Sequence, residues 1–538
     1  MKINKILLGA FALSMTFASC SNDEPAKGGS NNTVTNGEKY MAVKIKSVGN
    51  PASRADREFE DPVGEEGTIT KDNIRFYFFT AEGLPLMMST TGLNGIVKKT
   101  NMVKPFDVKP GNTDGGATEI EAVLVLGTVD EEGNGHPYEG NRPAKVFCVA
   151  NATDEATFEK FADVRLKELL NIEPFNTPGE WSKFRMTSST YLSGNTIVYY
   201  TDVTNNVKET KDEAMKAPAE IYLERLAAKI RVNGLGEYPV LSKDKDGNMV
   251  TTPVEYELYD GSEAGSVKTT LKVELQGWRT YMTANRAYAI KKIDASWTDD
   301  NLFKDWNKPE LHRCYWAEDP GLTQLNDNTY NIYEASQFTL GNYNKAKPTE
   351  NIKYVYENTL TDAILPASVT DRTTNATAIL VRGVVKRADN NTAVDMVQWG
   401  GDYYLASYWK QRVLDAYNEG KDPTSQATID QVEFVPDTYT KDAPANTYCC
   451  KIDGNVYNRF NFQYWKNGVT SYFVNIEHLG KKFGVVRNHI YDYTFTNVIG
   501  LGVPGNDPKN PEKNKETYLA ASVYCLNWHI SSNSLVLE

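Results

Sequence analysis

The chain has 538 residues, of which 40% are hydrophobic, and a formal net charge of −12 at pH 7. This length suits two to four domains with real hydrophobic cores, and the negative charge argues against nucleic acid or an anionic membrane surface as a partner. The 31 tyrosines, with frequent Thr, Val and Asn, favour β-structure.

Residues 1–19 have the pattern of a secretory signal peptide. Lys2 and Lys5 precede an apolar stretch at 6–13, and small residues lead to Cys20. The apolar stretch is shorter than the roughly 18 residues of a membrane-spanning helix, so no transmembrane anchor is expected. A polar tether follows at residues 23–39.

Residues 40–46 predict the first strand. Met41, Val43 and Ile45 alternate with other residues and would share one face. The charged, turn-prone segment 51–61 follows, and its Arg54 and Arg57 are open to a trypsin-like protease. Cleavage there would free the first strand from the rest of the fold.

The next stretch predicts β-structure with one helix. Residues 74–80, 120–126 and 145–150 are expected to be buried strands. Residues 152–170 have helical spacing and an N-cap at Thr153 or Asp154. The apolar stripe of this helix would consist of Phe158, Phe161, Ala162, Leu166 and Leu169.

A new block of strands begins at 223–232, so a domain boundary is expected near residue 218. The strands expected after it are 269–275, 378–386, 402–408 and 463–476, with a hairpin at Asp246-Gly247. Short strands between turn signals favour β-sandwiches over a parallel sheet, because few amphipathic helices are available to cover one. Trp399, Trp409 and Trp465 fit core or rim positions better than sugar-binding platforms.

The chain closes with a tethered strand. Residues 500–515 are rich in proline and glycine, and residues 517–530 alternate like a half-buried strand with Leu519, Ala521, Val523 and Cys525 on one face. This strand and the first one both begin with tyrosine, a large apolar residue and alanine. They could be alternative occupants of one groove, or both could be ordinary edge strands of one sheet.

Catalytic and metal-binding patterns are weak. Five histidines lack ligand or nucleophile-base spacing, which disfavours an enzyme. Residues 500–505 match G-x-G-x-x-G but no helix is expected after them, and the Asp244 loop fits a type I′ hairpin turn better than a calcium site. We therefore expect no cofactor and no metal. Apart from Cys20, five cysteines without C-x-x-C spacing are expected to be buried thiols.

Several segments, taken in order, resemble the fimbrillin family of Bacteroidetes, most closely the shaft subunits of short (minor) fimbriae. They are the lipobox-like region ending at Cys20, the segment around Arg54, ILVRGVVK at 379–386, GGDYYL at 400–405, the segment 485–502 and TYLAASVYCLNW at 517–528. Each one is a permissive strand or turn, and their order is more specific than any one of them.

The resemblance implies a mainly β protein with two transthyretin-like β-sandwich domains and few short helices. It divides the chain into a signal peptide (1–19), a propeptide with a plug strand (20–54), two domains (55–218 and 219–499), and a linker with a donor strand (500–538). Cys20 would carry the lipid, and an arginine-specific protease would cut Arg54-Ala55, with Arg57 as competitor. The segment 517–538 would then enter the groove of a neighbouring subunit.

The implied function is that of a structural subunit of an adhesive cell-surface fimbria, made as an outer-membrane lipoprotein. Its partners would be identical or related subunits, tip, accessory or anchor subunits, and a receptor that the sequence does not identify. Lipid on the precursor would be its only membrane contact. A different class remains open: a tip or accessory adhesin, or a glycan-binding surface lipoprotein, that never polymerises. A surface glycosidase is a third reading.

Overall fold

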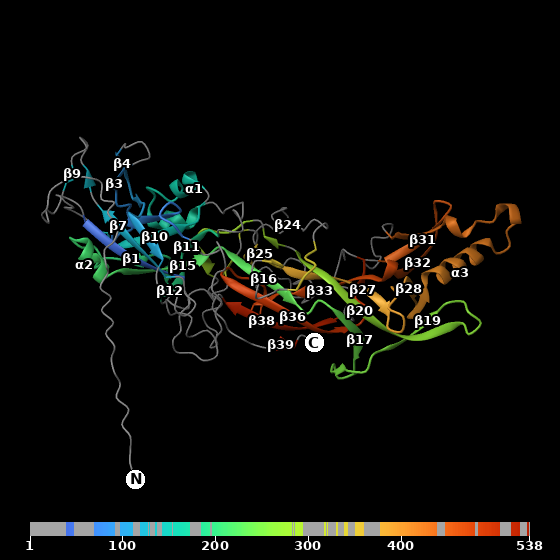
Figure 1. The fold of residues 1–538 in the computed structure, drawn as a ribbon. Coiled ribbons are helices and arrows are strands. Elements are labelled where there is room, and N and C mark those ends of the chain that lie inside the picture. Colours follow the sequence, from blue (N-terminus) through green and yellow to red (C-terminus); the bar gives the residue numbers. More distant parts are fainter. Residues whose placement is uncertain are drawn as a thin grey trace, which may run out of the picture.

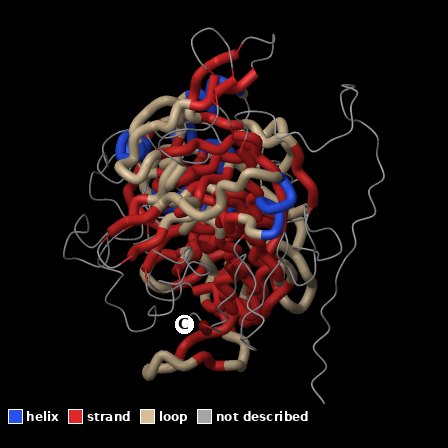
Figure 2. The backbone as a smooth tube through the Cα atoms, turned by 90° about the vertical axis from the view of Figure 1, so that its left-hand side faces the viewer, coloured by secondary structure: helices blue, strands red, loops and turns tan. Residues whose placement is uncertain are grey.

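The computed structural model describes most of residues 39–536, with gaps. The described residues are 39–47, 69–91, 97–110, 119–126, 128–129, 135–136, 143–152, 154–172, 184–193, 196–281, 283–284, 286–293, 317–318, 320, 330–331, 338–342, 350–359, 377–437, 447–478, 482–505, 518–527 and 535–536. They form an elongated, mainly β molecule with few short helices, consistent with β-sandwich domains (Figure 1). The same predominance of strands is visible from the side (Figure 2).

The first half of the chain builds a nine-stranded sheet in the order β5-β2-β10-β11-β15-β1-β7-β6, with β14 beside β10. The strands of this half are β1 Lys39–Ser47, β2 Ile74–Phe79, β3 Met88–Thr91, β4 Val97–Thr100, β5 Met102–Val103, β6 Asp107–Pro110, β7 Glu119–Leu126, β8 Thr128–Val129, β9 Gly135–His136, β10 Lys145–Ala150, β11 Met186–Ser188, β12 Tyr191–Ser193, β13 Thr196–Val198, β14 Thr201–Asp202 and β15 Ala219–Arg225.

Both faces of this sheet are buried around β2 and β10. In β2, Phe76 and Phe78 pack into a core shared with β1, β7, β10 and β15, while Tyr77 and Phe79 pack into a second core on the other face. The prediction of a buried strand at 74–80 is confirmed by β2. Alternation along each strand delivers apolar side chains to both sides, so the whole of β2 is buried.

The prediction of a single helix at 152–170 is wrong. The structure has α1 Glu155–Glu159 and a 3-10 helix at Leu166–Asn171, separated by Asp163 with a φ of 60°. The Asp163 carboxylate accepts hydrogen bonds from Thr100 Oγ1 (2.8 Å) and Asn101 N (3.0 Å). These contacts to another segment compete with helix continuation. The predicted N-cap is confirmed, because Asp154 Oδ1 accepts from Thr157 N at 2.6 Å.

The second half builds a sheet of 17 strands. Within this sheet β36 pairs with β16 on one side and with β38 on the other. The strands of this half are β16 Ala227–Asn233, β17 Glu237–Lys243, β18 Met249–Val250, β19 Glu255–Tyr259, β20 Ser266–Tyr281, β21 Thr283–Ala284, β22 Lys292–Ile293, β23 Ala317–Glu318, β24 Tyr330–Asn331, β25 Ile352–Tyr356, β26 Asn358–Thr359, β27 Ala378–Arg387, β28 Met396–Trp399, β29 Asp402–Leu405, β30 Val432–Pro436, β31 Thr447–Ile452, β32 Asn455–Trp465, β33 Val469–Asn475, β34 Glu477–His478, β35 Lys482–Val485, β36 His489–Ile499, β37 Val503–Pro504, β38 Tyr518–Asn527 and β39 Leu535–Val536.

The remaining helical elements are short except one. Besides α2 Lys211–Lys216 and 3-10 turns at Pro423–Ser425, Ile429–Gln431 and Lys466–Gly468, α3 covers Ala406–Asn418. The sequence predicted a strand through residue 408, whereas β29 ends at Leu405 and α3 begins at once. Buried Trp409 and Val413 are one helical turn apart, and this spacing was the available signal.

The hairpin at Asp246-Gly247 is confirmed, but its turn is not type I′. Gly247 has a φ of 86°, Asp246 is not among the residues with positive φ, and Gly247 N donates to Asp244 O at 3.0 Å. This is a type I turn followed by a left-handed glycine. The Asp244 carboxylate accepts from the backbone N–H groups of Asp246 and Asn248, so it stabilises the turn.

The chain passes from the first sheet to the second at Leu226, between β15 and β16. The sequence analysis expects a domain boundary near residue 218, and β15, which follows that residue, pairs with β11 and β1 of the first sheet. No turn signal separates the two strands in the sequence, so local pattern could not locate the crossing. The limits of the domains as folding units remain a prediction.

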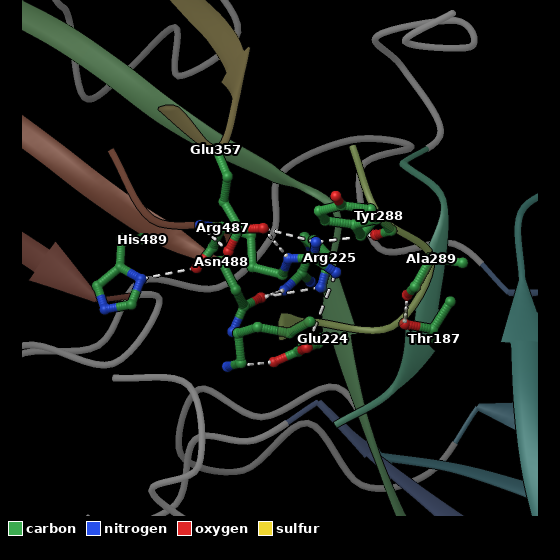
Figure 3. A network of polar contacts seen from close by, with 10 residues as sticks. Thr187, Glu224, Arg225, Tyr288, Ala289, Glu357, Arg487, Asn488 and His489 are labelled. Carbon is green, nitrogen blue, oxygen red and sulfur yellow. Dashed lines mark hydrogen bonds and ion pairs between the residues drawn. The ribbon is translucent and has the colours of Figure 1, made fainter. Parts of the chain in front are cut away.

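A buried ionic network joins the two halves beside this crossing (Figure 3). Lys291 Nζ and Glu224 Oε2 lie 2.9 Å apart, and both side chains are fully buried. Arg487 Nη2 lies 2.6 Å from Glu357 Oε2, and Arg487 Nε donates to the same oxygen at 2.7 Å. Thr187 of the first sheet also donates from Oγ1 to Ala289 O. Such charges are tolerated in an interior because each has a partner of opposite charge.

Cys148, Cys449 and Cys450 are fully buried, which confirms the predicted burial for these three of the five cysteines. Burial raises the pKa of the Cys148 thiol well above its usual range and that of Cys450 to about 12. Because thiolate is the reactive form, we expect all three to resist iodoacetamide in native buffer and to react in urea. Peptide mapping by mass spectrometry checks this, and native labelling of any of the three would contradict it.

Candidate functional site

The first strand, β1, lies inside the sheet of the first half. It pairs in parallel with β15, with Val43 opposite Ala219, and antiparallel with β7, with Met41 opposite Leu124. Figure 1 shows it flanked by these two strands in the blue lobe. Its removal would leave two strand edges with unpaired N–H and C=O groups.

The face of β1 that the sequence predicted is directed into the core. Met41, Val43 and Ile45 are 0%, 0% and 1% exposed and pack with residues of β2, β7, β10 and β15. On the other face, Lys44 Nζ lies 3.5 Å from Glu121 Oε1 of β7, and both side chains are partly exposed. An exposed ion pair adds little stability, so apolar burial and backbone pairing hold β1 in place.

The C-terminal strand β38 belongs to the other sheet. It runs antiparallel to β36, with His489 opposite Asn527 and Ile499 opposite Tyr518, and β39 lies on its other side. The backbone of the predicted donor residues is part of this pairing, with Leu519 opposite Val498, Ala521 opposite Phe495, Val523 opposite Tyr493 and Cys525 opposite Tyr491. The C-terminal strand is therefore paired within its own chain.

The alternative that both terminal strands are edges of one sheet is wrong. β1 is an interior strand of the first sheet, whereas among the described residues β38 pairs with β36 and β39 of the second. The physical reason is long-range: β1 completes a core made by residues 74–223, while β38 extends a sheet built around β36. The sequence could show that both segments form strands but not which strands accept them.

Several predicted site residues lie outside the described part of the chain. These are Cys20, Arg54, Ala55 and Arg57. Within the described residues, no group of three or more His, Cys, Asp or Glu side chains is arranged to hold a metal ion. Likewise, no helix in the described ranges is long and apolar enough to cross a membrane.

The tryptophans have the positions expected of core and rim residues. Trp409 and Trp465 are buried, and Trp465 Nε1 donates to Leu501 O at 3.2 Å. Trp399 is 37% exposed and its ring centroid lies 5.2 Å from that of Trp409. One exposed ring packed against a buried one is typical of the rim of a hydrophobic cluster.

Sequence reasoning missed a segment at the start of β1. Residues 203–217, which we call the clasp, include α2 and contact β1 ahead of its pairing with β15. Tyr40 and Lys208 form an antiparallel bridge, and Lys39 Nζ is paired with the Glu209 carboxylate. The sequence of the clasp carries turn and cap signals only, and none of them indicates which strand it will contact.

Comparisons with known proteins find similarity at the C-terminal end of the chain. Residues 456–534, which run from β32 to β38, match the family model described as major fimbrial subunit protein type IV, fimbrillin, C-terminal. No curated protein sequence matches the chain.

Solved structures show weaker similarity. A fimbrilin of Porphyromonas gingivalis aligns at 13% identity and a TM-score of 0.35, over 92% of this chain and 98% of that one. The tip fimbrial protein Mfa3 of the same organism aligns at 8% identity and a TM-score of 0.32, over 91% and 100%. A Parabacteroides distasonis protein, provisionally named a cell adhesion protein, aligns at 11% and 0.39, over 91% and 96%. TM-scores below 0.5 do not establish a shared fold.

Proposed function

We propose that this chain is a polymerising structural subunit of a cell-surface fimbria that supports adhesion, and the match of residues 456–534 to the fimbrillin C-terminal model supports this proposal. Its precursor is exported as an outer-membrane lipoprotein through Cys20. An arginine-specific protease cuts Arg54-Ala55, β1 leaves, and the segment 517–538 of another subunit takes its place.

The observation that carries the proposal is the position of β1. A nine-residue strand inserted between β7 and β15, with three fully buried side chains, precedes an arginine-containing segment in the sequence. A cut at Arg54 would sever β1 from the rest of its own sheet. The groove left behind would expose two strand edges and an apolar slot, which an incoming strand can complete.

The energetics favour a lasting complex. Burying about five apolar side chains of an incoming strand at roughly 1.5–3 kcal/mol each gives on the order of 8–15 kcal/mol before ordering costs. The pairing of β38 with β36 in its own chain would have to break first, so part of this energy offsets that loss. The contact between subunits is head-to-tail and need not close, so it propagates as a filament.

The test uses the purified precursor without its lipid. A trypsin-like protease is added, the new N-terminus is identified by mass spectrometry, and assembly is followed as SDS-resistant ladders. Cleavage after Arg54 together with ladders supports the polymerising subunit. Cleavage without ladders would instead favour a tip or accessory adhesin that only receives a strand.

We expect Arg54→Ala combined with Arg57→Ala to keep the precursor monomeric in this assay, because β1 remains covalently tethered in its groove. Each single variant shows which bond is used. A matched control is Arg387→Ala, because Arg387 pairs with Asp389 at the end of β27, which belongs to the second sheet, whereas the groove lies in the first. Ladders from the double variant, with residues 39–47 still attached, would contradict the plug role of β1.

A further inference from the structure

The first residues of β1 are paired by the clasp and not by β15. β15 pairs with β1 only from Val43 onward. Ahead of that point, Tyr40 N donates to Lys208 O at 2.9 Å, and Lys208 N donates to Tyr40 O at 2.8 Å. Two reciprocal hydrogen bonds make an antiparallel bridge, which fixes residue 40 of the strand opposite residue 208.

The clasp is held together by contacts of its own. Asn206 Nδ2 donates to Ala217 O at 3.1 Å, which ties its two ends together. Thr210 caps α2 by accepting from Glu213 N at 3.3 Å. Val203 and Ala214 are fully buried, and Val203 N donates to Ala144 O at 2.9 Å. None of these hydrogen bonds involves β1, so they can persist after β1 leaves, while Val203 shares its core with Met41, Val43 and Ile45.

The clasp borders a hollow at the point where β1 begins. Its volume is about 380 Å³, and its lining residues are Val207, Lys208, Glu209, Glu213, Lys216 and Ala217. Glu209 is the partner of Lys39, and its side chain is 58% exposed. A side-chain ion pair this exposed contributes little, so the backbone bridge at Lys208 is the main contact between the clasp and the strand.

We propose that the clasp anchors the first residues of the strand that replaces β1, by forming with Tyr518 of a second copy of this chain the backbone bridge that it forms with Tyr40. This inference rests on the proposed function. Tyr40-Met41-Ala42 and Tyr518-Leu519-Ala520 have the same order of residue types. Aligning the tyrosines puts Leu519, Ala521 and Val523 where Met41, Val43 and Ile45 are now buried.

Register matters because a strand has a period of two. A slip by one residue would turn the apolar face of the incoming strand away from the core. This register is unfavourable because the apolar side chains would lose their burial. A slip by two residues preserves the face and is not rejected in this way. The backbone bridge at Lys208 forms with any residue that has an N–H and a C=O, so it anchors the start of the incoming strand in either register. The side chains select the register, because a slip by two would put Ala521 or Thr517 in the buried site of Met41 in place of Leu519.

The side-chain part of the contact distinguishes the two strands. In the same alignment Thr517 replaces Lys39, so the ion pair with Glu209 belongs to the plug alone. We therefore expect Glu209→Gln to leave strand exchange within about twofold of the unmodified protein. This variant serves as the control for changes at Lys208.

The decisive experiment is disulfide trapping in the full chain, cleaved after Arg54 and assembled. Opposed residues of a hydrogen-bonded antiparallel pair have Cα atoms about 5.5 Å apart, which a disulfide can span. Lys208→Cys combined with Tyr518→Cys should give a 208–518 crosslink between subunits, identified by peptide mapping. Lys208→Cys with Ala520→Cys reports the slip by two residues and should give at least tenfold less.

A second pair tests the same bridge in the uncleaved protein. Tyr40→Cys with Lys208→Cys should form a 40–208 crosslink within one chain. After cleavage at Arg54 this chain should stay out of the ladders until a reductant is added, because its plug is still covalently held. Release without a reductant would show that residue 208 does not hold the plug.

A backbone variant separates the hydrogen bond from the lysine side chain. Lys208→Pro removes the N–H that donates to residue 40 or 518, whereas Lys208→Ala keeps it. We expect about tenfold slower ladder formation with Lys208→Pro and little change with Lys208→Ala. Equal rates for both variants, with the folded state checked by circular dichroism, would overturn the role of the bridge.

The outcomes distinguish this inference from the proposed function. Absence of ladders from the cleaved, unmodified chain counts against polymerisation itself. Ladders without the 208–518 crosslink, or with the 208–520 crosslink equally strong, count against the clasp while leaving polymerisation intact. Ladders with a dominant 208–518 crosslink support both.

Discussion

Deletion of residues 517–538 is expected to abolish SDS-resistant ladders after cleavage at Arg54. The deleted segment is the only strand we assign as donor, and its apolar residues account for most of the 8–15 kcal/mol estimated for the exchange. The deletion also uncovers one edge of β36, which pairs with β38 in the intact chain. β36 remains paired with β16 on its other side, and Ile490, Tyr491 and Tyr493 remain in the core.

A mixing experiment shows whether the truncated chain is folded. It keeps its groove but has no strand to donate, so it should end a growing fibre. We expect equimolar addition of the cleaved, truncated chain to the cleaved, complete chain to shorten the ladders to a few subunits. The Arg54→Ala and Arg57→Ala double variant should also end fibres, since it has a donor but a filled groove. Fibres from the truncated chain alone would refute strand donation by this segment.

Glu224→Gln is expected to be among the most destabilising single substitutions in the described chain. Glu224 lies 2.9 Å from Lys291 Nζ and 3.9 Å from Arg487 Nη1, and all three side chains are fully buried. Removing its charge leaves the buried ammonium of Lys291 without this carboxylate, which typically costs about 3–5 kcal/mol. Urea denaturation, monitored by tryptophan fluorescence, measures the change in the free energy of unfolding.

Two variants make this result specific. Adding Lys291→Met to Glu224→Gln should recover much of the loss, because an apolar side chain has no charge to leave uncompensated. Glu237→Gln breaks partly exposed pairs with Lys272 and Lys386 and should cost less than about 1 kcal/mol. If Glu224→Gln were no more destabilising than Glu237→Gln, the ionic network would not stabilise the junction between the two halves.

Local pattern alone predicted much of the β-structure. Alternation identified β1, β2, β10 and β38, including the buried face of Met41, Val43 and Ile45. The Asp154 cap and the hairpin at Asp246-Gly247 were also predictable, because caps and turns depend on residues close together in the sequence. Prediction from local pattern failed where a distant contact competes with the local signal. The helix expected at 152–170 is an example, because it is interrupted at Asp163, which accepts hydrogen bonds from Thr100 and Asn101.

By itself, the sequence determined that both ends of the chain form apolar strands and that arginines follow the first of them. Only the tertiary structure decided that β1 lies between β7 and β15, that β38 pairs with β36, and that the clasp meets β1 at Tyr40. It alone brought Glu224, Lys291, Glu357 and Arg487 into one buried network. The reason is that hydrogen bonds between strands and the burial of charges depend on residues far apart in the chain, and no local periodicity records which distant residues meet.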